Sequence, residues 1–337
     1  MADPTPRADT LSGLGSRWEH RAVRRWTQLV VAALFAVPLA ACSARSADGD
    51  CGRSGITPHP EIGGELVYTC FDPVNKSEMF SLDVATGRVR ALTADHAWAT
   101  DPAWSPDGAR IAYVSTKDGQ TDIYVMGLAD GRITRLTHDG GWNGNPTWSP
   151  DGSWIMFDSA RDGVNPSPHN NFRNLFLVRP DGSDLRRITS LPRYNGSPSW
   201  GPNGARVAFV SDRDDTFNIF TMTPDGSDQR QLTHRQGVDV GTGYARWSPD
   251  GARLVFAGYG PKRDSPPRLY WISVDGGEPH ELTTGNMADW SADGGWIAFY
   301  RDDSGRDQLF VVRPDGTGLT QLTTDRTSKA WARWRPR

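Results

Sequence analysis

Hydrophobic and polar positions alternate in short runs along residues 61–337, and no segment of this range shows a sustained helical period. One repeating unit illustrates the pattern. A strand-like run ends at Trp104, and Ser105–Gly108 follow with the composition of a tight turn. Residues 111–115 and 122–126 are rich in Ile, Val and Tyr, which favour strands, and a fourth run ends at Thr137. The pattern predicts four short strands per unit.

Two sequence markers repeat through this region with a period in the forties. One is a tryptophan, usually followed by Ser-Pro-Asp-Gly or a close variant, at Trp104, Trp148, Trp200, Trp247, Trp290 and Trp334. The other is Leu-Thr or Ile-Thr, at 92–93, 136–137, 188–189, 232–233, 282–283 and 322–323. Units of this length with four strands each are typical of propeller blades. The sequence therefore predicts an all-β fold, a six-bladed β-propeller of four-stranded antiparallel blades.

The two ends of the repeat region predict how the ring closes. The first hairpin partner, Glu65–Cys70, has no Trp strand before it, and the last marker, Trp334, has no strands after it. We expect the C-terminal strand to pair with residues 65–70 and complete the N-terminal blade. Such closure removes exposed strand edges.

Composition narrows the class of protein. Hydrophobic residues make up 37% of the chain and the mean hydropathy is −0.56, so residues 61–337 are expected to be a soluble body. The formal net charge is −3 and no Lys/Arg-rich run stands out in the repeats, which argues against a nucleic-acid partner. We expect a monomer.

The N-terminal segment has the features of an export signal. The apolar stretch Leu29–Ala41 follows Arg24 and Arg25, and it is too short to span a membrane as a helix. It ends in Leu-Ala-Ala-Cys42, which resembles the lipobox of bacterial lipoproteins. That resemblance implies a leader at residues 1–41, a lipidated Cys42 that begins the mature chain, a linker at 42–60 and the propeller at 61–337. The alternative is an ordinary signal peptide with an incidental cysteine.

Two further cysteines, Cys51 and Cys70, follow Cys42. In an exported chain they can form a disulfide that ties the linker to the first blade. A pair of free thiols is the alternative.

The repeated Trp-Ser-Pro-Asp-Gly, the runs such as Ile-Ala-Tyr-Val-Ser and the closing Leu-Thr resemble the propeller repeats of the TolB family. The resemblance covers about residues 61–337 and implies the fold, whereas a fold alone does not imply one activity. TolB carries an α/β domain ahead of its propeller, and here residues 43–60 separate the lipid site from the first blade. Similar repeats precede α/β-hydrolase domains in prolyl oligopeptidase-like enzymes, but the chain has no Gly-x-Ser-x-Gly motif.

Candidate binding residues occur in the loops between blades. Aromatic residues stand six positions before three successive repeat tryptophans, and two of them precede Asn-Gly: Trp98, Trp142 with Asn143, and Tyr194 with Asn195. Aromatic rings beside amides suit protein or glycan recognition on a rim of the ring. The alternative is that these rings pack between blades.

Four histidines fall in loops expected on the same face: His96, His138, His169 and His234. Imidazoles that converge on the mouth of the central channel could hold a divalent metal ion. Oligogalacturonate lyases, whose propellers have similar repeats, are an example of such chemistry. However, the chain has no His-Glu-x-x-His motif and no carboxylates at ligand spacing, so we expect no cofactor.

The residue before each repeat tryptophan is charged in three units, as Arg246, Asp289 and Arg333. These units are neighbours in the closed ring. The three side chains either bind an anionic ligand near the channel or form a structural ion network at the closure.

The sequence favours a membrane-anchored extracytoplasmic lipoprotein whose propeller is non-catalytic and binds an envelope protein, peptide or glycan on its loop face. The alternative is a metal-dependent polysaccharide lyase or hydrolase acting at the channel mouth. No nucleophile and base stand out to support that alternative.

Overall fold

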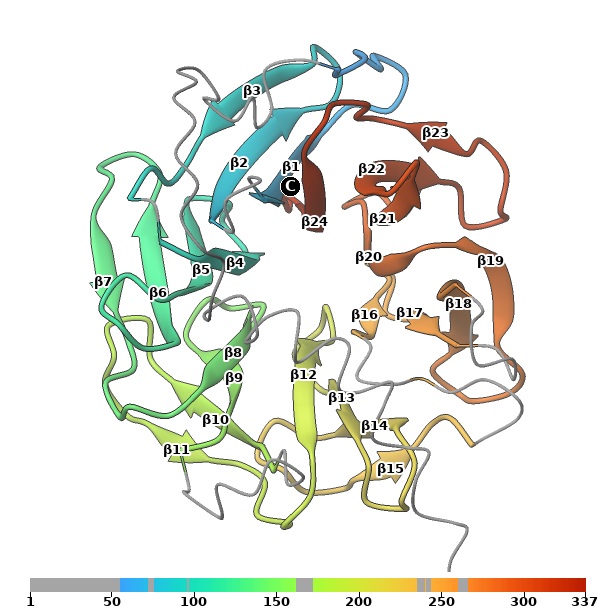
Figure 1. The fold of residues 1–337 in the computed structure, drawn as a ribbon. Helices are drawn as coiled ribbons and strands as arrows, with labels where there is room; N and C mark the ends of the chain where they lie inside the picture. Colours follow the sequence, from blue (N-terminus) through green and yellow to red (C-terminus); the bar gives the residue numbers. More distant parts are fainter. Residues whose placement is uncertain are drawn as a thin grey trace, which may run out of the picture. The chain divides into compact units, whose positions relative to one another are not determined.

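Six four-stranded sheets are arranged as a ring in the computed structural model of the protein (Figure 1). The structure describes residues 55–71, 76–95, 97–161, 172–234, 240, 244–259 and 266–337. All of these belong to one compact unit, residues 47–337. No described segment forms a helix long and apolar enough to cross a membrane.

The first three blades are antiparallel sheets, and the strands of each follow in order from the innermost to the outermost. Blade 1 contains β24 (Ser328–Trp334), β1 (Glu65–Phe71), β2 (Ser77–Asp83) and β3 (Arg88–Ala91). Blade 2 contains β4 (Ala99–Trp104), β5 (Arg110–Ser115), β6 (Asp122–Gly127) and β7 (Ile133–Arg135). Blade 3 contains β8 (Asn143–Trp148), β9 (Ile155–Ser159), β10 (Asn174–Val178) and β11 (Arg186–Arg187).

The other three blades have the same order. Blade 4 contains β12 (Asn195–Trp200), β13 (Val207–Ser211), β14 (Asn218–Met222) and β15 (Arg230–Gln231). Blade 5 contains β16 (Arg246–Trp247), β17 (Arg253–Gly258), β18 (Arg268–Ser273) and β19 (His280–Thr284). Blade 6 contains β20 (Asn286–Trp290), β21 (Ile297–Asp303), β22 (Arg306–Val312) and β23 (Thr320–Gln321). The predicted six-bladed, all-β fold is confirmed.

The ring closes through the last strand of the chain, as predicted. β24 pairs antiparallel with β1, from Leu66 opposite Trp334 to Phe71 opposite Ser328. Figure 1 shows the two strands side by side at the junction of the first and last colours of the chain. The C-terminal strand therefore supplies the innermost strand of blade 1, and the pairing covers the inner edge of β1.

The Ser-x-Asp pair of the tight turn has a local structural role. Asp107 accepts hydrogen bonds from the Ser105 hydroxyl at 2.5 Å and from the Ala109 N–H at 3.0 Å. The Ser105 hydroxyl in turn accepts the Arg110 N–H at 2.9 Å. The same arrangement recurs at Ser149, Ser248 and Ser291. These turns fix the register between the two inner strands of a blade.

The threonine of the Leu-Thr marker joins the two outer strands of a blade. The Thr137 hydroxyl accepts the Ile123 N–H at 3.0 Å and donates to the buried carboxylate of Asp122 at 2.5 Å. Equivalent N–H donors reach Thr93, Thr189, Thr233 and Thr323. The Leu-Thr marker therefore stabilises the blade through hydrogen bonds between its two outer strands.

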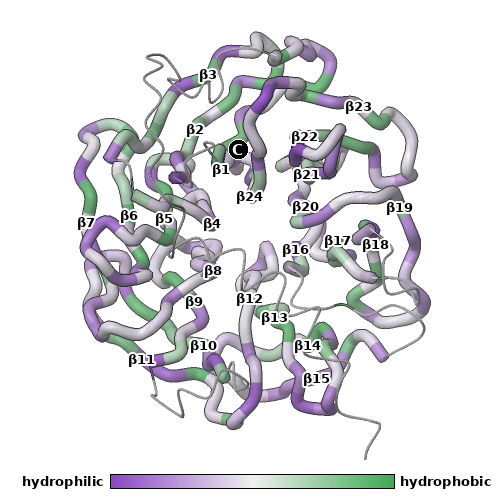
Figure 2. The backbone as a smooth tube through the Cα atoms, viewed as in Figure 1, coloured by the Kyte–Doolittle hydropathy of each residue, from purple (hydrophilic) through white to green (hydrophobic). Residues whose placement is uncertain are grey.

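Three of the repeat tryptophans join neighbouring blades through hydrogen bonds. The indole N–H of Trp104 donates to the Arg333 carbonyl, that of Trp148 to the Ala103 carbonyl and that of Trp247 to the Ser199 carbonyl, all at 3.0–3.1 Å. The hydrophobic clusters also join neighbours, since Val125 of blade 2 and Phe157 of blade 3 share one cluster. In Figure 2, middle strands such as β13 are coloured as hydrophobic, and outer strands such as β11 and β15 as hydrophilic.

Candidate functional site

The six blades diverge in sequence at one inner position, three residues before the repeat tryptophan. The residues there are Asp101, Asn145, Ser197, Tyr244, Met287 and Trp331. Five of them have positive φ, between 49° and 54°. In blades 1, 2, 3, 4 and 6 a register shift interrupts the pairing of the innermost strand beside this position. Bulged residues of this kind often direct side chains at functional sites, and these strands surround the ring axis (Figure 1).

Tyr244 connects opposite sides of the ring. Its hydroxyl donates to Asp101 Oδ1 at 3.1 Å and accepts the Trp331 indole N–H at 3.3 Å. These three residues belong to blades 5, 2 and 1, so the tyrosine side chain spans the ring axis. We use the name axial cluster for Tyr244, its two partners and the charged residues beside them: Asp101, Tyr244, Arg246, Asp289, Trp331 and Arg333.

The axial cluster contains two arginines that are almost fully buried, Arg246 at 9% exposure and Arg333 at 5%. Their guanidinium carbons lie 5.5 and 5.7 Å from the centre of the Tyr244 ring. Arg246 donates to the Pro198 carbonyl at 3.1 Å, and Arg333 donates to the carbonyl of Ala332 at 3.0 Å. Within the described part of the chain, neither guanidinium lies within 4.0 Å of a carboxylate.

The enclosed environment shifts the titration of these groups. Burial raises the pKa of Asp101 to about 6, against the opposing effects of the Arg333 charge and the Tyr244 hydrogen bond. Burial, followed by repulsion from Arg333, lowers the pKa of Arg246 to about 9. Burial also raises the pKa of Asp289, and Arg333 and Arg246 oppose that rise. The axis therefore holds two guanidinium groups and two carboxyl groups in an enclosed space, where burial disfavours the charged form of Asp101, Asp289 and Arg246.

The three charged residues singled out in the sequence thus come together. Arg246, Asp289 and Arg333 lie on β16, β20 and β24, the innermost strands of three consecutive blades. Asp289 Oδ2 accepts the backbone N–H of Trp334 at 2.8 Å, which fixes that carboxylate to the closing strand.

Two of the three loop aromatics pack onto their own strands. A Cβ atom added to Gly144 would lie 2.0 Å from the Trp142 ring, and one added to Gly196 would lie 2.6 Å from the Tyr194 hydroxyl. Glycine therefore follows these aromatics because the ring folds over it. Tyr194 is 3% exposed, and the Arg173 guanidinium covers Trp142 at 3.5 Å. Both rings therefore pack against residues of their own blade.

The amides beside these aromatics are also buried. Asn143 and Asn195 are both 0% exposed. Asn143 donates to the Thr121 carbonyl and accepts from Arg161, and Asn195 accepts from the Ser211 hydroxyl. Their side chains are engaged in contacts between loops and strands rather than displayed on a rim.

Trp98 differs from the other two aromatics, because Ala99 and Thr100 follow it where Asn and Gly follow the others. The Trp98 side chain is half-buried and contacts Phe71 edge-on, at 6.1 Å between ring centres. Phe71 also contacts Trp331, at 5.5 Å. A row of aromatic rings therefore leads from the loop face at Trp98 to the axial cluster.

The histidines give no metal cluster among the described residues. No group of three or more His, Cys, Asp or Glu side chains in the described ranges could hold a metal ion. His138 and His234 are exposed. His96 and His169 lie outside the described residues.

Cys70 forms a disulfide in the structure. Cys42 and Cys51 lie outside the described residues, as do the leader and most of the linker, so the Cys51–Cys70 pairing stays a prediction. Thr327 Oγ1 lies 3.2 Å from Cys70 Sγ, which places the disulfide beside the closing segment of the ring.

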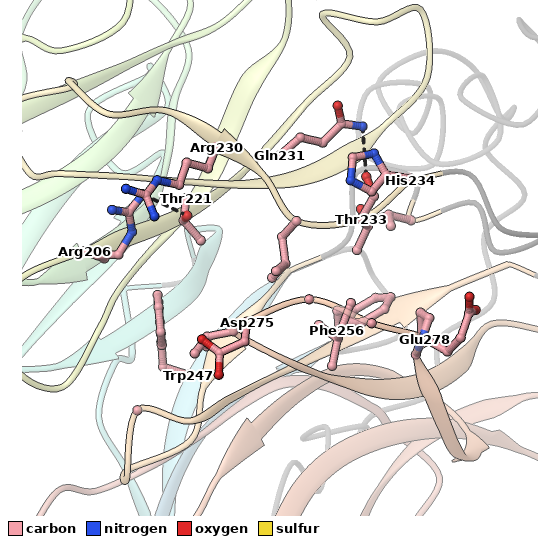
Figure 3. A pocket seen from close by; sticks show the side chains of 18 of the residues that line it. Arg206, Thr221, Arg230, Gln231, Thr233, His234, Trp247, Phe256, Asp275 and Glu278 are labelled. Atoms are coloured by element: carbon pink, nitrogen blue, oxygen red, sulfur yellow. Dashed lines mark hydrogen bonds between the residues drawn. The ribbon is translucent and has the colours of Figure 1, made fainter.

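A groove of about 830 Å³ lies between blades 4 and 5. Figure 3 shows Arg206 and Gln231 on the blade 4 side, and Trp247, Asp275 and Glu278 on the blade 5 side. Arg206 donates hydrogen bonds to the Asp228 carboxylate and the Thr221 hydroxyl.

Sequence reasoning missed Asp101, Tyr244 and Trp331. An alignment of the six units at the third residue before the tryptophan would have shown them as the divergent set. The contact between Tyr244 and Asp101 could not be found this way, because it joins opposite blades.

Comparison with known proteins gives a family match over most of the chain. The family model described as the TolB beta propeller domain matches residues 56–171 and 170–324. The chain is 35% identical to a protein TolB homolog of Chlorobium luteolum over 158 residues, which is 47% of this chain and 34% of the relative. It is 42% identical to the Tol-Pal system protein TolB of Bordetella pertussis over 113 residues, 33% of this chain and 24% of the relative.

The aligned region thus spans about a third or less of these curated relatives. Among solved structures, TolB from Acinetobacter baumannii superposes with a TM-score of 0.70 at 20% identity, covering 81% of this chain and 67% of that one. At that identity the superposition shows the shared fold.

Proposed function

Because this chain belongs to the TolB β-propeller family, we propose that it is a non-catalytic, extracytoplasmic binding protein whose partner is a protein of the cell envelope. The partner would bind the loop face around the ring axis, at Trp98 and the axial cluster. Two of the relatives named above are Tol-Pal system or TolB proteins, which supports an envelope role.

One observation carries this proposal. The blades agree at the residues that build turns, strands and blade junctions, and they diverge where side chains meet at the axis. Six different residue types stand at equivalent positions there. Structural repetition would favour similar residues, so divergence in a set of equivalent positions indicates recognition of an asymmetric partner.

The direction of the loops supports the choice of face. The backbone of Trp98 forms an isolated parallel β-bridge with Ser77, and that of Tyr194 forms one with Arg173. The segments entering blades 2 and 4 therefore lie beside the starts of β2 and β10, at the same end of the ring. Loops positioned by a rigid scaffold commonly carry binding residues.

We further propose that Cys42 is lipidated and anchors the protein on the extracytoplasmic side of a bacterial membrane. The basis is the Leu-Ala-Ala-Cys sequence after an apolar stretch. Labelling with radioactive palmitate, with and without globomycin, tests the anchor. Absence of label on Cys42 would contradict it.

The binding role is tested by a pull-down from solubilised membranes with the lipidated protein. We expect Trp98→Ala to lose the captured protein while its melting temperature stays close to the wild type. Trp142→Ala serves as the matched control, because its ring packs over Gly144 and beneath Arg173. That variant should melt earlier and, where folded, still capture the partner. Capture of glycan without protein, or of nothing, by the wild type would contradict a protein partner.

A further inference from the structure

The axial cluster contains an electrostatic anomaly. Buried charges in proteins are normally paired, and each unpaired buried polar group requires an explanation. Elsewhere this fold obeys the rule: Arg135 lies 2.6 Å from Asp122, and Arg173 lies 3.2 Å from Asp158. Arg246 and Arg333 are more deeply buried and have no such partner among the described residues.

Their own hydrogen bonds use few of their donors. A guanidinium carries five N–H groups in a planar fork. Arg246 directs one nitrogen to the Pro198 carbonyl, and Arg333 directs one to Ala332. The Nε of Arg333 is buried without any acceptor. Donors therefore remain on both arginines beside the Tyr244 ring.

Asp289 and Asp101 attract both arginines without forming a close ion pair with either, and each carboxylate also accepts a hydrogen bond from another group. Asp289 Oδ2 accepts the Trp334 N–H, and Asp101 Oδ1 accepts the Tyr244 hydroxyl. The two guanidinium groups also repel each other. A negatively charged planar group that contacts both arginines would reduce the repulsion between them and accept hydrogen bonds from their unused N–H groups.

We propose that Arg246 and Arg333 form a receptor for a carboxylate group carried by the bound partner. The proposal rests on the proposed function and names the chemistry of its central contact. The carboxylate comes from an acidic side chain or from a chain terminus, and a peptide titration distinguishes the two sources.

Isothermal titration calorimetry on the purified full-length chain, at low salt, provides the test. The probes are acetyl-tetraglutamate amide, which has only side-chain carboxylates, and acetyl-tetraglycine with a free C-terminus. Acetyl-tetraglutamine amide is the neutral control. We expect at least one acidic peptide to bind tenfold or more tightly than the control and to weaken as NaCl rises. Equal affinity of all three peptides would overturn the receptor.

Substitutions of the axial residues test whether the acidic peptide binds at the axis. Arg246→Gln and Arg333→Gln should each weaken the acidic peptide at least tenfold, since a hydrogen-bonded charge is lost. Arg186→Gln, on the exposed outer strand β11, is the matched control and should leave affinity unchanged. Asp289→Asn removes a competing negative charge and should tighten binding severalfold. It keeps the test decisive if either arginine variant folds poorly. Unchanged affinity in the arginine and Asp289 variants would overturn the proposal.

The membrane pull-down separates this inference from the proposed function. If both arginine variants fold and capture the partner as the wild type does, the receptor is wrong and the binding role stands. If the wild type captures no protein, the binding role fails, and the peptide titration alone decides whether the axis receives carboxylates.

Discussion

At the scale of single residues, buried cationic side chains occur in two different environments. Lys329 at the closing strand is 0% exposed and fully engaged, with its Nζ 2.5 Å from Asp325 and 2.9 Å from the Thr327 hydroxyl. Among the described residues, Arg246 and Arg333 at the axis have no carboxylate within 4.0 Å. The ion pair of Lys329 stabilises the fold, whereas the unused N–H donors of the two arginines remain available to a ligand.

Lys329→Met should destabilise the protein strongly. The substitution leaves the Asp325 carboxylate buried at 3% exposure without its cation, and breaking a buried pair in this way costs about 3–5 kcal/mol. The free energy of unfolding, measured by urea denaturation, checks the value. Arg88→Met breaks an exposed pair with Asp83 and should cost below about 1 kcal/mol. Similar losses in both variants would contradict the structural role of Lys329.

Asp101 predicts a pH dependence of stability. Its pKa is raised from 3.8 to about 6, so folding favours the protonated form. The stabilisation is therefore fully present below pH 4 and is lost as the pH rises through about 6, by up to about 3 kcal/mol. Asp101→Asn cannot titrate and retains an acceptor for the Tyr244 hydroxyl, so it should gain stability relative to the wild type as the pH rises from 4 to 7.

The comparison of the two proteins at each pH isolates Asp101. Asp307 also has a pKa raised to about 6, by burial, and titrates with the same sign in both proteins. Chemical denaturation at pH 4.5, 6.0 and 7.5 gives the difference directly. A constant difference across this range would show that Asp101 does not titrate with a raised pKa.

At the scale of the blade, Thr137→Val tests the Leu-Thr device. Valine matches the shape of threonine but removes the acceptor of the Ile123 N–H and the donor to Asp122. The Ile123 N–H then loses its acceptor and Asp122 loses one of its donors, which should lower the free energy of unfolding by about 1–3 kcal/mol. Thr134→Val, on the outermost strand of the same blade, is the control and should change stability by below about 0.5 kcal/mol. Equal effects would mean that the marker has no special structural role.

The structure of a single blade is also what the sequence alone predicts best. The roles of Ser105, Asp107 and Thr137 depend on hydrogen bonds within one unit, so their spacing repeats and is visible in the sequence. Trp142 and Tyr194 were ambiguous, because a ring that folds over a glycine and a ring on a rim have the same spacing. The structure places the Tyr194 ring inside the protein, at 3% exposure.

At the scale of the whole ring, prediction from sequence reached the closure but not the axis. The closing strand could be identified because Trp334 lacked the strands that follow every other marker. The Tyr244–Asp101 contact spans 143 residues and depends on where opposite blades meet. No local sequence pattern predicts a contact between opposite blades. The sequence could therefore place Arg246, Asp289 and Arg333 in neighbouring blades, but it could not predict which residues they contact.

The closure makes a prediction about the integrity of the molecule. Removal of residues 328–337 takes away β24, exposes the edge of β1 and deletes the buried side chains of Ala330, Ala332 and Trp334. We expect the truncated protein to lose its cooperative melt and to aggregate. Removal of residues 336–337 alone, which lie beyond β24, should change the melting temperature little.

A peptide of residues 324–337 should restore the truncated protein when added in excess during refolding, because an extended peptide can complete a sheet by adding a strand. The restored complex should regain a cooperative melt whose midpoint rises with peptide concentration, since the peptide binds the folded ring. The same peptide with Lys329→Met should restore it less well, because the Asp325 carboxylate then remains buried without its cation. A truncated protein that melts like the wild type without peptide would show that the ring does not depend on this strand.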